Sequence, residues 1–321
     1  MTRTRISYPR TVEEFRKMLG SDEACIDYLI QNRWPDGFFC PDCDNDSFWV
    51  RNGRLLLICK RCRKNIYPLA GTLMHGSHVP LHKWFWAAYS ISTLTPGISA
   101  HQLQRQLGLG SYRTAWYMLG RLRKGMVNDK RSRLQGVVEA DETIIGGPSK
   151  NNRGRGTVDD SHKSLVAGAV EVISYIDKKG DQKEKAGRLR LSLIQHADEK
   201  TIKRFLNDNL EKSSIVRTDG WRGYSTTALK GYIHNAQVQH SSLKAHQLSP
   251  HIHRAFSNLK TWLTGTHHGV EPKYLQGYLD EYIFRYNRRQ NPMAAFQTLL
   301  VIALGKSHSS LKIFKEVASS A

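Results

Sequence analysis

The stretch Val137–Thr143, VVEADET, predicts the strand around which the second half of the chain is arranged. Its β-branched residues favour an extended backbone, and the glycines and proline at 146–148 end it. The stretch Ser214–Gly220, SIVRTDG, repeats the design with an apolar run, an aspartate and then a glycine. A strand fixes the Cα atoms near its end, while the following loop leaves a carboxylate open to a ligand. We therefore expect Asp141 and Asp219 to be available for chemistry.

A third stretch, His251–Lys260 or HIHRAFSNLK, is expected to be helical. His253 and Lys260 are seven residues apart, so in a helix they lie on nearly the same face. Three segments far apart in the sequence thus carry residue types that bind metal ions or phosphates. The sequence predicts that they converge on one site.

The charge of the chain indicates a polyanionic partner. The 321 residues carry a formal net charge of +20, from 48 Lys and Arg against 28 Asp and Glu. Residues 1–50 hold 9 acidic and 6 basic residues, whereas residues 51–133 hold 15 basic residues and a single acid, Asp129. Cations this unopposed repel one another unless an anion such as nucleic acid neutralises them. A merely solvated surface is the alternative, but such surfaces usually mix both signs.

The strongest local motif consists of four cysteines with the spacing C-x2-C-x15-C-x2-C. This is the spacing of a four-thiolate zinc site, and the apolar runs between the cysteine pairs can form a hairpin. A segment this small has little core of its own, so Zn²⁺ would supply its folding free energy. Four thiolates leave no open position for substrate, which makes the predicted role structural. The predicted zinc ligands are Cys40, Cys43, Cys59 and Cys62.

The expected location of the protein is the cytoplasm. No apolar run approaches the roughly 18 residues of a membrane span, and the N-terminus lacks the apolar core of a signal peptide. Disulfides are the alternative for the cysteine motif, but a cytoplasmic chain disfavours them.

Residues 11–33 predict two short helices, the second capped by Ser21 or Asp22. Cys25 lies on the apolar face of that second helix and is expected to be a small buried hydrophobe.

Residues 81–126 predict helices, two of which are separated by a short glycine turn at Gly108–Gly110. A helix, a tight turn and a helix that opens with a hydroxyl cap is the pattern of a helix-turn-helix. Any helical hairpin has the same outline, but the scarcity of acids here favours DNA binding. The residues predicted to contact DNA are Ser111, Tyr112 and Arg113 at the start of the second helix, and Arg121, Arg123 and Lys124 further along it.

From residue 134 the pattern changes to strands. Apolar runs at 164–173 and 187–194 follow the first strand and predict an antiparallel meander, then a helix from 199 and the strand at 215–218. This order describes a mixed α/β layer rather than a barrel or a bundle. The basic stretch from Gly146 to Gly156 predicts a flexible loop, which either contacts phosphates or is simply solvated.

In combination, these segments resemble the transposases of the ISXO-type insertion sequences. The similar blocks are Val138–Gly147, Thr218–Tyr224, His253–Lys260 and Tyr278–Arg289, and the resemblance extends from about residue 10 to 300. It implies a DDE-type enzyme with a ribonuclease H-like core behind an N-terminal zinc ribbon. It also implies that Asp141 and Asp219 are the first two catalytic acids. The third position falls on His253, where the wider superfamily has Glu.

The fold class expected from motifs and resemblance together is a multidomain α/β protein. The predicted parts are N-terminal helices (1–35), a zinc ribbon (36–69), a helix-turn-helix DNA-binding segment (80–128), a ribonuclease H-like mixed-sheet catalytic domain (134–290) and a C-terminal helix and tail (291–321).

Phosphodiester cleavage is the chemistry that suits these acids. It needs a nucleophilic water and a stabilised leaving oxygen, and two divalent ions can supply both. Mg²⁺ prefers carboxylate oxygens, which Asp141 and Asp219 provide, whereas the imidazole of His253 suits Mn²⁺ or orients water. Lys260 is expected to reach a DNA phosphate. The prediction is a transposase that binds the ends of its element in double-stranded DNA, cuts them and joins the freed 3′-hydroxyl to target DNA, as a homodimer or higher oligomer.

Two other functions remain open at this point. A ribbon and a helix-turn-helix would suffice for a DNA-binding transcriptional regulator whose second half is an inactive nuclease-like domain. A metal-dependent nuclease would cleave DNA without transferring strands. The intact acids at Asp141 and Asp219 count against the regulator, and joined products would distinguish a transposase from a nuclease.

Overall fold

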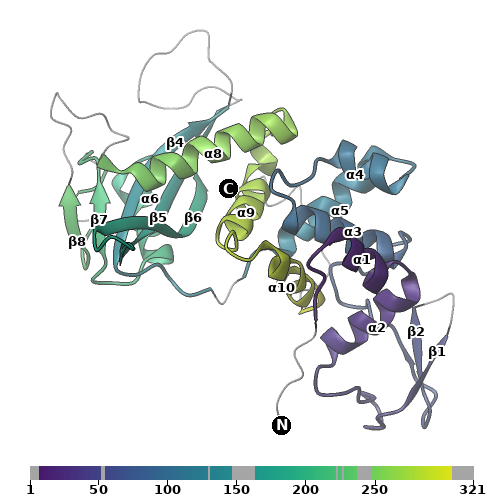
Figure 1. Cartoon of the computed structure of the whole chain (residues 1–321). Coiled ribbons are helices and arrows are strands. Elements are labelled where there is room, and N and C mark those ends of the chain that lie inside the picture. The colour runs from purple at the N-terminus through teal and green to yellow at the C-terminus, as the bar shows by residue number, and fades with distance from the viewer. Residues whose placement is uncertain are drawn as a thin grey trace. The chain divides into compact units, whose positions relative to one another are not determined.

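The computed structural model describes residues 7–51, 55–128, 131–146, 163–221, 223–225, 228–236 and 248–305 (Figure 1). These residues form two compact units. The first unit extends to Asn128 and resumes at Arg288, and the second extends from Asp129 to Asn287. The chain therefore leaves the first unit, forms the second, and returns to the first for its last described helix.

Aromatic side chains hold the helices of the first unit together. Phe296 is fully buried and makes ring contacts with Phe15, Tyr28, Phe85 and Tyr89, with centroids 5.8 to 6.3 Å apart. Buried aromatic pairs favour separations of this order. The helices that contribute these rings are α1 (Val12–Leu19), α2 (Asp22–Arg33), α3 (Leu81–Thr93) and α10 (Pro292–Gly305). The sequence predicted a helix after Pro292, but not that it packs on the N-terminal helices.

The two predicted N-terminal helices are confirmed, with hydroxyl caps at both. Thr11 accepts a hydrogen bond from the backbone of Glu14 at 3.0 Å, and Ser21 accepts one from Ala24 at 3.2 Å. Cys25 is fully buried, as predicted, and its thiol donates to the carbonyl of Leu19.

The four predicted zinc ligands form one cluster at a small antiparallel sheet. The sheet has the order β1-β2-β3, from β1 (Phe48–Arg51), β2 (Leu56–Cys59) and β3 (Asn65–Ile66). The four ligand atoms lie within 4.8 Å of one another, with Cys40 and Cys62 Sγ 3.5 Å apart and Cys43 and Cys59 Sγ 3.6 Å apart. Thiolates at 2.3 Å from a tetrahedral zinc ion are about 3.8 Å apart, so the cluster fits structural Zn²⁺.

The local environment favours a thiolate at Cys59. Burial alone raises the pKa of this thiol. Hydrogen bonds from the backbone N–H groups of Cys62 and Arg61 and from the neighbouring thiols outweigh burial and lower the pKa to about 6. The thiolate is the form that binds metal, so these hydrogen bonds favour zinc binding by Cys59.

Helices α4 (Ala100–Leu107) and α5 (Tyr112–Gly125) pack on each other across the predicted glycine turn. The hydroxyl of Ser99 accepts from the backbone of Gln102, and that of Ser111 accepts from Arg113 at 3.1 Å. The predicted helix, turn and hydroxyl-capped helix are therefore present.

The second unit is built on a five-stranded sheet with the order β6-β5-β4-β7-β8. The first three strands in sequence form the predicted antiparallel meander, β7 is parallel to β4, and β8 is parallel to β7. The sequence did not predict β8. The elements of this unit are β4 (Val137–Ile145), β5 (Ser164–Ile176), β6 (Gln182–Ile194), α6 (Glu199–Asn209), β7 (Ile215–Thr218), β8 (Ile233–Ala236), α8 (Pro250–His267), η1 (Pro272–Tyr274) and α9 (Leu275–Tyr286).

The two faces of this sheet are covered differently. Val138 and Ala140 of β4 are fully buried in a core that includes residues of α6. Val166 and Val170 of β5 lie in a second core with residues of α8 and α9, and Figure 1 shows α8 crossing the sheet. Glu139 and Asp141 alternate with Val138 and Ala140, so they face α8. The mixed α/β layer predicted from the sequence is confirmed, and its central strand carries acids on one face.

The predicted basic loop lies outside the described residues beyond Gly146, as does the predicted tail beyond Gly305. Among the described helices, none combines the length and the apolar character that crossing a bilayer requires.

Replacing a zinc ligand should unfold the small sheet. Cys43→Ser is expected to lower the zinc content from one ion per chain to none, because three thiolates cannot close the tetrahedral site. Zinc is measured by atomic emission, and the loss of structure by amide hydrogen exchange of residues 36–66. Cys25→Ser is the matched control, since this buried thiol lies outside the cluster, and it should retain the ion. Full zinc content in Cys43→Ser would contradict the assignment.

Candidate active site

Asp141 lies in the middle of β4, and Asp219 directly follows the neighbouring parallel strand β7. The pairing of β4 with β7 matches Val137 with Ile215 and Glu139 with Arg217. Continued by two residues, this register places Asp219 beside Asp141. Neighbouring strands are about 4.8 Å apart, so this register indicates that the two predicted acids lie near each other although 78 positions separate them in the sequence.

The backbone turn after β7 holds Asp219 in place. Oδ1 of Asp219 accepts a hydrogen bond from the backbone of Trp221 at 3.0 Å, and the hydroxyl of Thr218 accepts one from Gly220 at 3.2 Å. Gly220 has a φ of 76°, a left-handed conformation that glycine adopts without strain. The Asp-Gly pair that the sequence singled out is thus a turn whose geometry requires the glycine.

A buried tyrosine ties this turn to β4. The hydroxyl of Tyr224 donates to Oε1 of Glu142, the residue that follows Asp141. Burial raises the pKa of Tyr224 well above its usual value, and the charges of Glu142, Asp141 and Asp219 raise it further. The hydroxyl therefore stays protonated as a donor, and both predicted acids lie close enough to Tyr224 to act on it. Neither Glu142 nor Tyr224 was among the site residues predicted from the sequence.

Helix α8 brings the third predicted residue to the same acids. Nε2 of His253 lies 3.6 Å from Oδ2 of Asp141, and the two side chains are 31% and 19% exposed. The backbone of Glu142 donates to the other oxygen of Asp141 at 2.8 Å. Lys260, two turns along α8, is exposed. The predicted convergence of β4 and α8 is therefore present, with Lys260 at the surface.

The close approach of α8 depends on Gly168, which the sequence analysis missed. Gly168 is the β5 partner of Asp141. A Cβ atom there would lie 2.6 Å from two ring atoms of Phe256 and 3.0 Å from Cδ1 of Ile252. Both residues belong to α8 and flank His253, so a side chain at this position would push the helix away from Asp141.

The fit of these residues to a divalent ion is partial. Within the described residues, the four cysteines form the one group of three or more ligand atoms that lie within 4.8 Å of one another. The carboxylate of Asp219 is turned toward Trp221, while that of Asp141 faces His253. Carboxylate oxygens and one imidazole are suitable donors for Mg²⁺ or Mn²⁺, and the hydrogen bond from Trp221 occupies only Oδ1 of Asp219.

The predicted DNA contacts on α5 fall into two groups. Ser111, Tyr112 and Arg113 are exposed and Lys124 is half-buried. Arg121 is 5% exposed, and its guanidinium donates to the carbonyls of Leu73 and His75. Arg123, listed among the predicted contacts, is 4% exposed. Burial of these two arginines does not fit the predicted DNA contact, since Arg121 instead satisfies backbone carbonyls inside the first unit.

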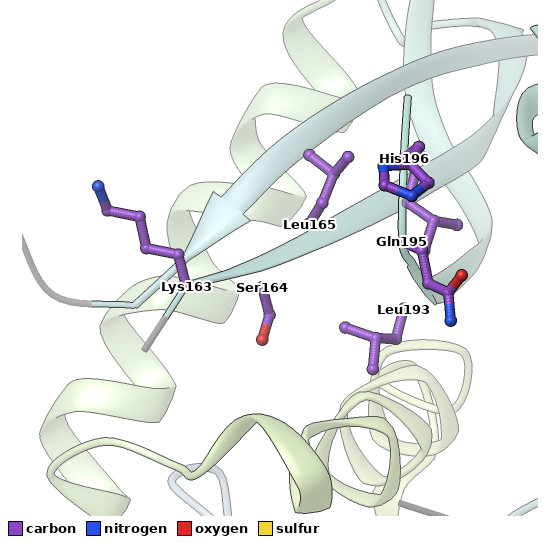
Figure 2. Close-up of a pocket in the computed structure, with 7 residues that line it drawn as sticks. Lys163, Ser164, Leu165, Leu193, Gln195 and His196 are labelled. Carbon is purple, nitrogen blue, oxygen red and sulfur yellow. The ribbon is translucent and has the colours of Figure 1, made fainter. Parts of the chain in front are cut away.

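A pocket of about 360 Å³ lies further along the same sheet (Figure 2). Ser164 of this pocket pairs with Ile145, four residues beyond Asp141 on β4. Figure 2 shows Ser164 and Leu193 directed to one side of the strands and Leu165 and His196 to the other. The pocket contains none of the predicted site residues. It lies about 13 Å from Asp141 along the strand, so the pocket is separate from the site formed by the acids.

Comparisons with known proteins match both units. Residues 133–287 match the family model described as an ISXO2-like transposase domain, and residues 20–65 match the model described as a transposase zinc-ribbon domain. A protein described as uncharacterized, in the transposable element ISH50 of Halobacterium salinarum, is 26% identical over 302 residues. The aligned region covers 90% of this chain and 99% of that protein. Helices α4 and α5 lie between the two matched ranges.

A transposase zinc-ribbon domain followed by an ISXO2-like transposase domain supports a transposase-type enzyme. Both matches confirm the resemblance predicted from the sequence motifs, to the DDE-type insertion-sequence transposases of the ISXO-like group with an N-terminal zinc ribbon.

Gly168→Ala should destabilise the second unit by about 1–3 kcal/mol, because the added methyl group overpacks the contact with Phe256. The free energy of unfolding is measured by chemical denaturation. Gly265→Ala is the matched control on α8: Gly265 is exposed, has no atom within 4 Å of an added Cβ, and should gain about 0.5–1 kcal/mol in helix propensity. Equal effects of the two substitutions would show that the approach at Gly168 is not tight.

Proposed function

We propose that the protein binds the ends of its insertion sequence, hydrolyses the phosphodiester there and transfers the freed 3′-hydroxyl strand to target DNA. The observation that carries this proposal is the placement of Asp141 on β4 and of Asp219 directly after the adjacent parallel strand β7, with His253 3.6 Å from Asp141. The sheet supports a ribonuclease H-like core, because three antiparallel strands are followed by two parallel strands on the other side of β4.

The acids would act through two divalent cations, Mg²⁺ or Mn²⁺. When bound, such ions activate the attacking oxygen and stabilise the leaving oxygen. Asp141 would bind the cations from β4, and Asp219 would bind them from the turn after β7. His253 would complete one coordination shell directly or through water. Lys260 is exposed on the same helix and would bind a phosphate of the DNA strand.

Recognition of the DNA ends would fall to the first unit. Helices α4 and α5 support a helix-turn-helix, since the exposed Ser111, Tyr112 and Arg113 begin the second helix, where side chains can reach base edges. The ribbon presents further cations, with the guanidinium of Arg63 4.3 Å from the ring centroid of the exposed Trp49. Arg121 and Arg123 are left out of this interface because they are buried. Joining two ends requires at least a homodimer in the DNA complex.

The two alternatives lead to different products. A DNA-binding regulator would bind the ends without nicking them, and a nuclease would nick without joining. The acids on β4 and after β7 favour an enzyme over a regulator, and the match to a transposase domain favours strand transfer over simple hydrolysis.

Asp141→Asn and Asp219→Asn should each reduce end cleavage and joining at least about 100-fold, because each removes a charged cation ligand. The assay incubates wild type and variants with a supercoiled plasmid carrying both ends of the element, in Mg²⁺ or Mn²⁺, and resolves nicked and joined DNA on gels. Affinity for the ends is measured in parallel and should change less than about threefold, since the proposed recognition surface is in the other unit.

Asp208→Asn is the matched control, because this exposed acid on α6 carries the same chemical change away from the site. It should cleave and join like wild type. Full joining by either Asp141→Asn or Asp219→Asn would refute the proposed chemistry, and cleavage without joining by wild type would identify a nuclease.

A further inference from the structure

Glu139 is a buried carboxylate on the same face of β4 as Asp141. Its side chain is 0% exposed, and it lies two residues before Asp141 on the strand. A carboxylate removed from water is costly unless donors or positive charges meet it. The partners of Glu139 therefore indicate why an acid occupies this position.

Those partners are the first amides of α8. Oε2 of Glu139 accepts hydrogen bonds from the backbone of His251 at 2.8 Å and of Ile252 at 2.9 Å. The first N–H groups of a helix have no acceptor within the helix, and the helix dipole favours a negative charge there. Ser249, at the N-cap position, makes no side-chain hydrogen bond to α8 within the described residues. An acid 112 positions earlier in the sequence thus caps this helix.

The cap fixes the part of α8 that carries His253. The two capped amides belong to the residues immediately before His253, and Ile252 also lies against the backbone of Gly168 on β5. Glu139 holds the end of the helix to β4, while Gly168 allows its next turn to approach β5. His253 then lies 3.6 Å from Asp141, which follows Glu139 on the same face of the same strand.

We propose that Glu139 is a positioning residue, which caps α8 and thereby holds His253 against Asp141. The proposal rests on the proposed function, in which His253 and Asp141 take part in DNA cleavage. Glu139 itself contacts neither the DNA nor the cations. Glu139 acts through helix α8, so its loss should slow DNA cleavage because His253 moves away from Asp141.

A double-mutant cycle tests this role. The variants are Glu139→Ala, Glu139→Gln, His253→Ala and the double variant Glu139→Ala/His253→Ala, assayed for the rate of end cleavage and for end affinity. Glu139→Ala should slow cleavage about 10- to 100-fold, as expected when a supporting hydrogen bond is lost, with end affinity within about twofold. Glu139→Gln keeps an acceptor of the same reach and should stay within about fivefold of wild type.

The cycle separates positioning from general stability. In the His253→Ala background, Glu139→Ala should slow cleavage less than about twofold further, because the residue it positions is already gone. Leu206→Ala, which truncates a fully buried side chain in the opposite core, is the control for stability loss and should leave the cleavage rate near wild type at a temperature where it is folded. Equal slowing by Glu139→Ala in both backgrounds would overturn the proposal, as would a Gln variant as slow as the Ala variant.

Hydrogen exchange tests the cap without using activity. Amides at 250–258 should exchange at least about tenfold faster in Glu139→Ala than in wild type, and near the wild-type rate in Glu139→Gln. Unchanged protection in Glu139→Ala would overturn the proposal even if cleavage is slow. If the wild-type protein cleaves no DNA but the cap behaves as described, the proposed function fails while the structural role of Glu139 stands.

Discussion

Strand β4 carries Glu139 and Asp141 on the face that α8 covers and Glu142 on the opposite face, and the fold supplies a partner to each of these carboxylates. Glu139 is met by the first amides of α8, Asp141 by the backbone of Glu142 and the ring of His253, and Glu142 by Tyr224. Each contact also attaches another segment to the strand. Glu139 attaches the helix with His253, and Glu142 attaches the turn that follows Asp219. The contacts that partner these carboxylates therefore also bring the segments of the site together.

Much of this arrangement could be predicted from local patterns. Asp219 follows an apolar run and precedes a glycine, which is enough to place it at a strand end. Asp141 was expected at a strand end as well, but β4 continues to Ile145, so this acid lies in the middle of the strand. The four cysteines have a spacing that itself defines a metal site. Helices with hydroxyl caps, such as the one beginning after Ser111, are recognised from a few neighbouring residues.

The parts that escaped prediction depend on contacts between distant residues. Nothing near Glu139 in the sequence indicates that it caps a helix 112 positions away, and Gly168 resembles any small residue in a strand. Arg121 looked like a DNA contact because its neighbours are basic, yet it reaches the carbonyls of Leu73 and His75. Charge counted along a sequence does not distinguish arginines that bind phosphates from those that satisfy a protein backbone.

In the proposed function, the two units of the molecule have different roles. The first contains the zinc ribbon, the exposed start of α5 and much of the positive charge, which suits DNA binding. The second contains the acids and depends on packing that places them to within ångströms. The proposed chemistry would therefore be sensitive to substitutions, such as those at Gly168, that never touch the reactants.

The central claim is that Asp141 and Asp219 jointly hold divalent cations. The most direct measurement is the anomalous scattering of a crystal grown with Mn²⁺. The account predicts Mn²⁺ between the two carboxylates, within about 2.5 Å of an oxygen of each, with His253 at the edge of the site. Manganese bound elsewhere in the second unit, with the two carboxylates directed to different surfaces, would contradict it.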